Sequence, residues 1–279
     1  MLHFIVGDIH GCIDELILLE QLIERVSRRR KQVFKLISVG DLVDRGPDSK
    51  AVVQRFMDGE KRGSHLAIMG NHESNFLEYL RNEHSKWFRK NRLRLPKWVY
   101  TLEERHSASR WAKGISLNEH PIISKAFFFA QGGIETLHSY GVNPKNPSSK
   151  ELPPEHIRYL SQLPLFYEHK NFIVSHALPK KRDFMAVRRY LRGKKSLDLE
   201  IKKACDSLYW NRDMTGVKKI GHKVLISGHT PYKIPRRREK SRVIQVDTHC
   251  FKGRRLTAYC PELDRFFSVK AKKLYYGKT

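Results

Sequence analysis

The stretch HFIVGDIHGC, residues 3–12, joins a short apolar run to an aspartate and a histidine that stand between glycines. Residues 3–6 predict a buried strand, and the turn after it places Asp8 and His10 at its carboxyl end. A lone aspartate in a glycine-framed turn is typical of local hydrogen bonding to backbone amides. A metal site is the alternative, and it requires similar polar residues at the ends of other strands.

The same arrangement of strand, polar loop and helix recurs along the first third of the chain. The motif GDLVDRGP follows a second apolar run, and GNHE follows a third. The predicted elements are strands at 33–39 and 66–69 and helices at 14–26, 49–57 and 76–80, with Ser49 as a helix cap. Such alternation predicts an α/β fold, in which ligands bind at the carboxyl ends of the strands.

The second half of the chain is richer in predicted strands. The segments NFIVSHA, KVLISGHTP and SRVIQVDTHC each end an apolar run in polar residues, and RRLTAYCPELDRFFSV at 254–269 predicts a hairpin. Residues 82–130 lack this pattern, because they are basic and aromatic, with KWFRKNRLRLPKWVY at 86–100. We interpret them as a helical insertion, a cap on a single domain that spans residues 1–279.

Composition restricts the partners and the compartment. The chain has 54 Lys and Arg against 29 Asp and Glu, a net charge of +25, which favours anionic partners such as phosphoesters or nucleic acid. The four cysteines have no CxxC spacing, which predicts reduced thiols and a cytoplasmic location. No run approaches the roughly 20 apolar residues of a membrane span.

Seven polar residues at predicted strand ends form a candidate metal-binding set. They offer the carboxylate, amide and imidazole donors that borderline divalent metals prefer. A single histidine of this kind is most often a core or turn residue, but so many strand endings of the same type favour a metal centre. The set comprises Asp8, His10, Asp41, Asn71, His72, His176 and His229.

The motifs GDIHG, GDLVDRG, GNHE, SHA and GHTP occur in an order that resembles the PPP family of metallophosphoesterases. The resemblance runs from residue 3 to about residue 250 and is strongest to the bacterial and phage protein phosphatases, through WNRD at 210–213 and GGIETLHSYG at 132–141. It implies an α/β sandwich of two mixed sheets flanked by helices. It also implies a hydrolase that uses two divalent metal ions.

The resemblance further implies a role for each residue of the set. Asp8 and His10 are expected to bind one metal, and Asp41 is expected to bridge it to a second that is held by Asn71, His176 and His229. Two such ions can hold a hydroxide nucleophile and polarise the phosphoryl oxygens. Mn²⁺ is the expected metal, with iron or zinc as alternatives.

The resemblance also implies roles in phosphate binding and proton transfer for His72 and for three further residues. Arg45 and Arg212 resemble the phosphate clamps of the family, a role that suits the planar, bidentate guanidinium. His72 resembles the residue that donates a proton to the leaving alkoxide, and Asp44 resembles the carboxylate that orients it.

Three functions are compatible with the sequence. The complete VDRG motif with Asp44 favours phosphoserine and phosphothreonine in proteins as the substrate. The alternative is diadenosine tetraphosphate or a related dinucleoside polyphosphate, because Pro47 in RGP is shared with that branch. A second alternative is a nucleic-acid or polyanion-binding protein with secondary phosphatase activity, given the net charge of +25.

One position departs from the family pattern. The family branch usually has Asp-Thr-Gly where this chain has DTHC, so His249 occupies the place of a glycine. We expect the His249 side chain to face solvent and exclude it from the site. The basic segments 180–195 and 236–242 are interpreted as solvated surface, as is the charge of the 82–130 insertion.

Overall fold

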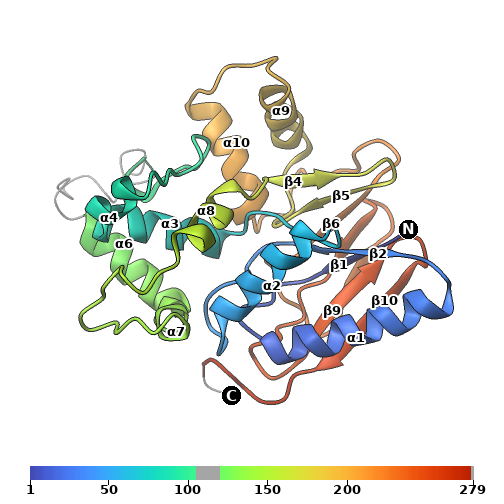
Figure 1. Ribbon diagram of the computed structural model, residues 1–279. Coiled ribbons are helices and arrows are strands. Elements are labelled where there is room, and N and C mark those ends of the chain that lie inside the picture. Colours follow the sequence, from blue (N-terminus) through green and yellow to red (C-terminus); the bar gives the residue numbers. More distant parts are fainter. Residues whose placement is uncertain (105–119, 278–279) are drawn as a thin grey trace.

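The structure is a computed structural model that describes residues 1–104 and 120–277. Two mixed β-sheets stack face to face, and helices cover both outer faces (Figure 1). This confirms the predicted sandwich of two mixed sheets flanked by helices. No helix among these residues is both long and apolar enough to cross a membrane.

The first sheet has the strand order β10-β9-β1-β2-β3. Strands β1, β2 and β3 run parallel, as expected for consecutive strand and helix units, whereas β9 and β10 form the predicted antiparallel hairpin beside β1. The bounds are β1 Leu2–Val6, β2 Phe34–Ser38, β3 His65–Ala67, β9 Arg255–Cys260 and β10 Arg265–Lys270.

The second sheet has the order β4-β5-β6-β8-β7, with three parallel strands at its centre and an antiparallel strand at each edge. The central strands are the apolar runs that end in SHA, in GHTP and in DTHC. The bounds are β4 Phe166–Glu168, β5 Phe172–Ser175, β6 Val224–Ser227, β7 Arg236–Arg238 and β8 Val243–Gln245.

The central strands are buried on both faces, so their residues alternate between two cores. In β1, Phe4 and Val6 pack toward the helices, whereas Ile5 packs between the sheets with Val174 and Ile226 of the opposite sheet. This explains why the runs are continuously apolar rather than alternating. Burial on both faces fixes the register, and the register fixes which residues lie at each strand end.

Helices enclose the sandwich. The first sheet is covered by α1 and α2, and the second by α9 and α10, while the remaining helices gather at the left of Figure 1. The bounds are α1 Ile13–Arg29, α2 Ser49–Lys61, α3 Asn71–Glu83, α4 Ser85–Lys90, α6 His120–Phe128, the π-helical turn η3 Phe129–Gly133, α7 Ile134–Ser139, α8 Pro154–Gln162, α9 Lys181–Leu191 and α10 Leu199–Trp210.

One local expectation is corrected. Asp48, not Ser49, caps α2, since its side chain accepts the Ala51 N–H at 2.9 Å. Ser49 is buried instead, and its hydroxyl accepts the Asp44 N–H at 3.0 Å. Of the predicted insertion, 82–130, the described parts include α4 and α6, and residues 105–119 lie outside the described residues. The cap and the single-domain organisation stay predictions.

Candidate metal centre

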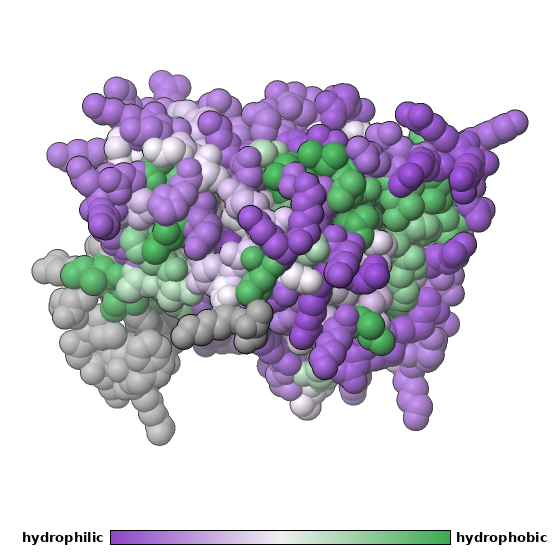
Figure 2. Space-filling model, turned by 90° about the horizontal axis from the view of Figure 1, so that it is seen from below, coloured by the Kyte–Doolittle hydropathy of each residue, from purple (hydrophilic) through white to green (hydrophobic). Residues whose placement is uncertain are grey.

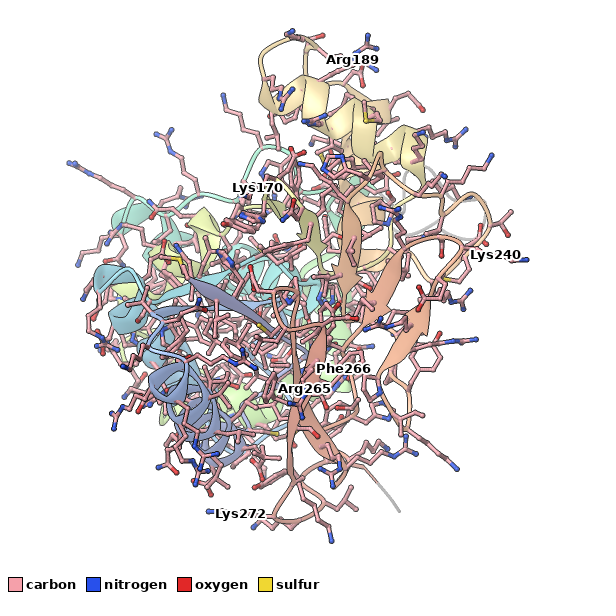
Figure 3. All side chains as sticks on the ribbon, turned by 90° about the vertical axis from the view of Figure 1, so that its right-hand side faces the viewer. Lys170, Arg189, Lys240, Arg265, Phe266 and Lys272 are labelled. Carbon is pink, nitrogen blue, oxygen red and sulfur yellow. The ribbon has the colours of Figure 1, made fainter. Side chains whose placement is uncertain are left out.

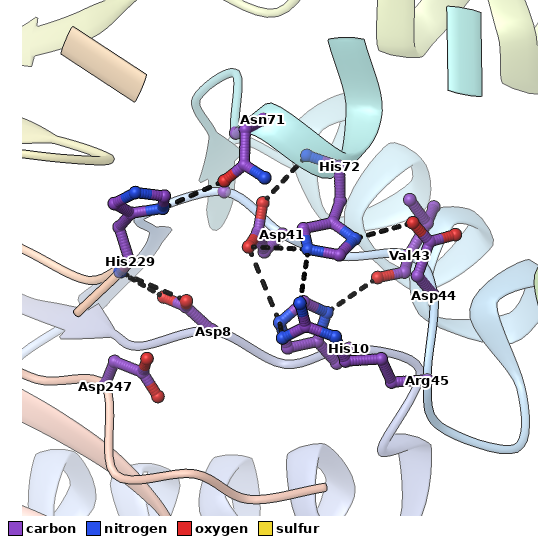
Figure 4. Close-up of polar contacts among 12 residues, drawn as sticks. Asp8, His10, Asp41, Val43, Asp44, Arg45, Asn71, His72, His229 and Asp247 are labelled. Carbon is purple, nitrogen blue, oxygen red and sulfur yellow. Dashed lines mark hydrogen bonds and ion pairs between the residues drawn. The ribbon is translucent and has the colours of Figure 1, made fainter. Parts of the chain in front are cut away.

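Polar residues from the ends of five strands meet in one buried cluster (Figure 4). Each residue follows the carboxyl end of its strand within five residues, so the parallel strands bring all of them to one edge of the sandwich. None is more than 4% exposed. The residues are Asp8 and His10 after β1, Asp41 after β2, Asn71 and His72 after β3, His176 after β5 and His229 after β6.

Asp41 lies between two groups of potential ligands. One carboxylate oxygen is 3.5 Å from His10 Nε2, and the other is 3.4 Å from His176 Nε2. The donor atoms of His10, Asp41 and His72 lie within 4.8 Å of one another, as do those of Asp8, Asp41 and His176. Asp41 therefore has the position that a bridging carboxylate requires.

Asn71 joins the second group to His229. Its Oδ1 lies 2.9 Å from His176 Nε2 and 2.9 Å from His229 Nδ1. The His229 backbone N–H in turn donates to both oxygens of Asp8, at 3.2 and 3.1 Å. The structure thus brings all six sequence-predicted ligands together, although it places His72 close to Asp41 as well.

The tautomers of two histidines direct a lone pair into the cluster. The Nδ1 atoms of His10 and His176 lie 2.9 and 2.8 Å from the carbonyl oxygens of Val43 and Val39. A carbonyl can only accept, so Nδ1 carries the proton and Nε2 is free to bind a cation. Arg45 supports this assignment, because its guanidinium can only donate and lies 3.0 Å from His10 Nε2.

Burial keeps these imidazoles neutral. It lowers the pKa of His10 and of His72, with the Arg45 charge adding to the effect, and it lowers the pKa of His176 to about 3. Neutral imidazole is the form that ligates metals. The donor set therefore needs no deprotonation of histidine to bind a cation near neutral pH.

The carboxyl groups experience the opposite effect. Burial and repulsion from Asp247 and Asp41 raise the pKa of Asp8, and burial and repulsion from Glu73 raise that of Asp41. Buried carboxylates with like-charged neighbours are costly unless a cation compensates them. Together with unprotonated nitrogens that face them, they make a donor set that fits two divalent metal ions.

Backbone strain is concentrated in the loops that carry the site. His10, Asp41 and His229 have φ values of 47°, 54° and 64°, in the left-handed region that non-glycine residues rarely adopt. Asp44 and Arg45 follow the same pattern, at 72° and 68°. Such strain persists only where the surroundings enforce it, and it clusters at functional sites.

Glu73 enforces the geometry of the loop after β2, a role that sequence reasoning missed. Its fully buried carboxylate accepts the backbone N–H groups of Asp41, Leu42 and Val43 at 2.9, 2.7 and 3.2 Å, and that of Gly70 at 2.9 Å. The signal was present in GNHE, because a glutamate at the third position of a helix typically binds backbone N–H groups at its start.

Asp44 orients His72. The His72 Nδ1 atom lies 2.6 Å from Asp44 Oδ2, and the Thr136 hydroxyl donates to Asp44 Oδ1 at 2.6 Å. The Nε2 atom of His72 faces the cluster and lies 2.9 Å from a guanidinium nitrogen of Arg45. Thr136, which belongs to α7 within GGIETLHSYG, was not among the predicted site residues.

Both predicted arginines line the pocket above the cluster, a cavity of about 270 Å³. The Arg45 guanidinium donates to the Gln131 backbone carbonyl at 3.3 Å and to the Gln131 side-chain oxygen at 3.2 Å. Arg212 is exposed and donates to His229 Nε2 at 3.2 Å. Two guanidinium groups therefore converge on the space beside the candidate metal ligands, as binding of a phosphoryl group requires.

The same pocket has lining residues that the sequence interpretation did not include. Asp247 is buried beside Asp8, and Lys252 and Tyr276 lie at the rim. His249 also lines the pocket, so the expectation that it faces solvent was wrong. Its φ of 58° is one that glycine adopts easily, and its ring stays half-buried 5.3 Å from the Phe251 ring.

The family comparison agrees with this geometry. The family model of the calcineurin-like phosphoesterases matches residues 3–233. The asymmetrical bis(5'-nucleosyl)-tetraphosphatase of Bacillus velezensis is 25% identical over 269 residues, which cover 93% of this chain and 88% of the relative. Serine/threonine-protein phosphatase 1 of Salmonella typhimurium is 33% identical over 120 residues, which cover 43% of this chain and 50% of the relative.

Solved structures show the same fold. A mutant of a cold-active protein tyrosine phosphatase superposes with a TM-score of 0.52 at 13% identity, over 97% of this chain and 80% of that chain. This similarity, together with the family match, confirms the metallophosphoesterase-type fold that the strand-end motifs predicted.

Proposed function

Because this chain belongs to the calcineurin-like phosphoesterase family and is thus a phosphoester hydrolase, we propose that it cleaves dinucleoside polyphosphates in a metal-dependent reaction. The observation that carries the reaction type is the convergence of Asp8, Asp41 and His229 with two arginines around one pocket.

The residues fit two divalent ions. In the division that the family resemblance implies, Asp8, His10 and Asp41 would hold one, and Asp41 with Asn71, His176 and His229 would hold the other. Asp8 also lies within reach of the second ion, because its donor atom is within 4.8 Å of those of Asp41 and His176. When bound, such ions supply a nucleophilic water with a lowered pKa and neutralise charge on the phosphoryl oxygens. Mn²⁺ is the proposed metal, because the imidazole donors suit a softer ion than Mg²⁺.

The remaining residues bind the phosphate and manage one proton. Arg45 and Arg212 would clamp the phosphoryl oxygens through charge-assisted hydrogen bonds. His72, oriented by Asp44, would donate a proton from Nε2 to the departing oxygen. In the resting site burial and Arg45 lower the His72 pKa, but a bound phosphate attracts the Arg45 guanidinium and adds negative charge, and both effects raise that pKa.

The extent of similarity supports dinucleoside polyphosphates over phosphoproteins. The tetraphosphatase relative matches nearly the whole chain, whereas the serine/threonine phosphatase matches less than half of it. Sequence reasoning ranked these substrates in the opposite order, because it relied on Asp44. The extent of similarity favours dinucleoside polyphosphates, which the sequence motifs placed second.

Phosphoserine or phosphothreonine in proteins is the second candidate. The observation in its favour is the hydrogen-bonded chain from Thr136 through Asp44 to His72. An alkoxide leaving group gains most from a positioned proton donor, whereas a nucleotide phosphate leaves with less help.

A substrate panel tests the proposal. The purified protein is stripped with a chelator, reloaded with Mn²⁺ or Mg²⁺, and assayed with diadenosine tetraphosphate, phosphoserine peptides and RNA. We expect no activity without metal, more with Mn²⁺ than with Mg²⁺, and the highest kcat/KM for diadenosine tetraphosphate. Asp41→Asn, compared with Cys205→Ala in α10 outside the site, should lose activity while remaining folded.

Three results would contradict the proposal. Full activity of the chelated protein would exclude the metal mechanism, and comparable losses in Asp41→Asn and Cys205→Ala would exclude the ligand assignment. A higher kcat/KM for phosphopeptides than for diadenosine tetraphosphate would favour the second candidate.

A further inference from the structure

The C-terminal tail, residues 271–277, returns from β10 to the pocket and is fixed there. The buried Glu15 carboxylate in the first turn of α1 accepts the Lys272 N–H at 2.8 Å and the Tyr275 hydroxyl at 2.9 Å. The Tyr275 N–H donates to the Phe251 carbonyl at 2.9 Å, and Leu274 forms a β-bridge with Lys252. These bonds hold the tail beside the loop that follows DTHC.

This anchoring puts an aromatic side chain at the pocket. Tyr276 lines the cavity, and its hydroxyl lies 3.4 Å from the Ala130 carbonyl. The Tyr276 ring centroid is 6.4 Å from that of Phe251, and the Arg45 guanidinium lies 4.7 Å above the Phe251 ring. From the phosphate-binding arginine outward, the wall is therefore formed by Phe251 and then Tyr276.

Lys252 supplies a cation in the same part of the pocket. It lines the cavity, and within residues 1–104 and 120–277 no carboxylate is paired with its ammonium group. A Cβ atom on Gly277 would lie only 2.6 Å from Lys252 Nζ, so the end of the tail packs against the amine. A half-buried, unneutralised cation favours an anion as its partner.

We propose that Tyr276 and Lys252 form a nucleotide subsite next to the metal centre. Lys252 pairs with phosphates beyond the one held by Arg45, and the Tyr276 ring stacks on the base. The subsite rests on the proposed function, because it receives the part of a dinucleoside polyphosphate that does not react. A phosphopeptide has no base that would use this aromatic wall.

Inhibition of a small aryl phosphate reaction by ADP and by pyrophosphate tests the subsite. Base stacking on an aromatic side chain is worth about 1–3 kcal/mol, so Tyr276→Ala should raise the Ki of ADP by about tenfold and that of pyrophosphate by less than twofold. Tyr276→Phe keeps the ring and should stay within twofold of the parent for both inhibitors.

The charge is tested with a matched pair of lysine variants. Lys252→Gln should raise the Ki of ADP and of pyrophosphate alike, by roughly fivefold or more, because both carry the phosphates. Lys240→Gln removes the same charge from the exposed turn between β7 and β8 and should change neither. Thermal melts of all variants report whether the tail still folds.

Two results would overturn the subsite. The first is equal loss of ADP and pyrophosphate inhibition in Tyr276→Ala, which would assign the tail a purely structural role. The second is the absence of competitive ADP inhibition in the parent protein.

Assays with diadenosine tetraphosphate separate the two proposals. If it is hydrolysed but Tyr276→Ala leaves its KM within twofold of the parent, the subsite is wrong and the proposed function stands. If it is not hydrolysed although ADP inhibition depends on Tyr276, the subsite stands and the proposed substrate is wrong.

Discussion

His72 shows how a single residue sets the range of leaving groups. Its ring sits between Asp44, at 2.6 Å, and the pocket, so that only Nε2 can reach a substrate. A proton on Nε2 matters most when the departing oxygen is strongly basic. The identity of the leaving group is thus a direct probe of this residue.

We expect His72→Asn to slow alkyl phosphate hydrolysis far more than aryl phosphate hydrolysis. General-acid help contributes on the order of 10²–10⁴ in rate, and an activated aryl leaving group needs little of it. Steady-state kcat/KM for the two substrates in parent and variant, with metal content measured in both, checks this. If both rates fall by the same factor, His72 has another role than proton donation.

Gly228 is a second residue whose identity follows from contact with the site. A Cβ atom there would lie 1.9 Å from Asp8 Oδ1 and 2.6 Å from a methyl group of Val39. An alanine would force the Asp8 carboxylate or the loop after β6 to move. The glycine of GHTP is therefore required by close approach to a proposed metal ligand.

Gly228→Ala should lose metal and activity together. We expect metal content to fall by about one ion per chain and overpacking to cost roughly 1–3 kcal/mol of unfolding free energy. Gly221→Ala is the control, because its φ of 59° strains an alanine while no atom lies within 4 Å of the added Cβ. Retention of parental metal content and activity in Gly228→Ala would contradict the assignment of Asp8 as a ligand.

The strands could be predicted from the sequence, whereas the long-range contacts could not. The apolar runs before Asp8, Asp41 and His229 predict strands, because each is buried on both faces and ends abruptly in polar residues. GNHE indicates only the local bond of Glu73 to the Gly70 N–H. Its bonds to the backbone of Asp41, Leu42 and Val43 require the loop after β2 to fold over the start of α3, and no local pattern encodes that. Tyr276 reaches the pocket because its neighbour Tyr275 forms long-range hydrogen bonds to Glu15 and Phe251.

The hairpin β9–β10 is tied to β1 by another such long-range contact. Glu262, in its turn, accepts the His3 N–H at 3.0 Å and lies 2.7 Å from His3 Nδ1. Burial alone would raise the Glu262 pKa, but the hydrogen bonds from His3 outweigh it and lower the pKa to about 2. A carboxyl group whose pKa is lower in the folded protein than in the unfolded chain stabilises the fold at pH values above its unfolded pKa. This stabilisation is lost as the pH falls through the folded pKa.

The difference in unfolding free energy between the parent and Glu262→Gln should therefore depend on pH. This difference in unfolding free energy should be largest above about pH 4.5, the ordinary pKa of a glutamate. It should fall to less than half of its maximum by pH 3, because the pH then approaches the folded pKa of about 2. We expect about 1–2 kcal/mol at pH 6, allowing for solvent screening. Urea unfolding of chelated parent and variant at pH 6, 4 and 3 measures it, and a gap that is constant with pH would contradict the assignment. Glu239→Gln, on the exposed end of β7, is the control.

The whole molecule presents a basic surface around a pocket for anions. Figure 3 shows Arg189 of α9 at the top, Lys240 of the turn between β7 and β8 at the right and Lys272 of the C-terminal tail at the bottom, and the face in Figure 2 is mostly hydrophilic. Basic side chains therefore lie on several sides of the molecule. The predicted nucleic-acid interaction stays a prediction, and a spread field favours general attraction of anions over sequence recognition.

A group of basic residues around the start of α9 lies beside the loop that carries Arg212. Lys181 and Arg182 at the start of α9 line a surface hollow with Lys218, and Lys180 pairs with Asp213 at 3.0 Å. The basic strand β7, in contrast, contributes no residue to the lining of the metal pocket. The cations near Arg212 are thus better placed to attract a substrate.

Replacing Lys181, Arg182 and Lys218 together with glutamine should weaken the salt dependence of catalysis. Attraction between exposed charges acts over a Debye length of about 8 Å at physiological ionic strength, so kcat/KM for a tetraanionic dinucleotide should fall as salt rises. The variant should show a lower kcat/KM at low salt and a flatter salt response, with kcat changed by less than twofold. The control replaces Arg29, Arg30 and Lys31, which are exposed at the far end of α1, about 25 Å along the helix from the site. If both triple variants flatten the salt response equally, net charge alone attracts the substrate; if neither does, association is not electrostatically steered and the basic surface serves another partner.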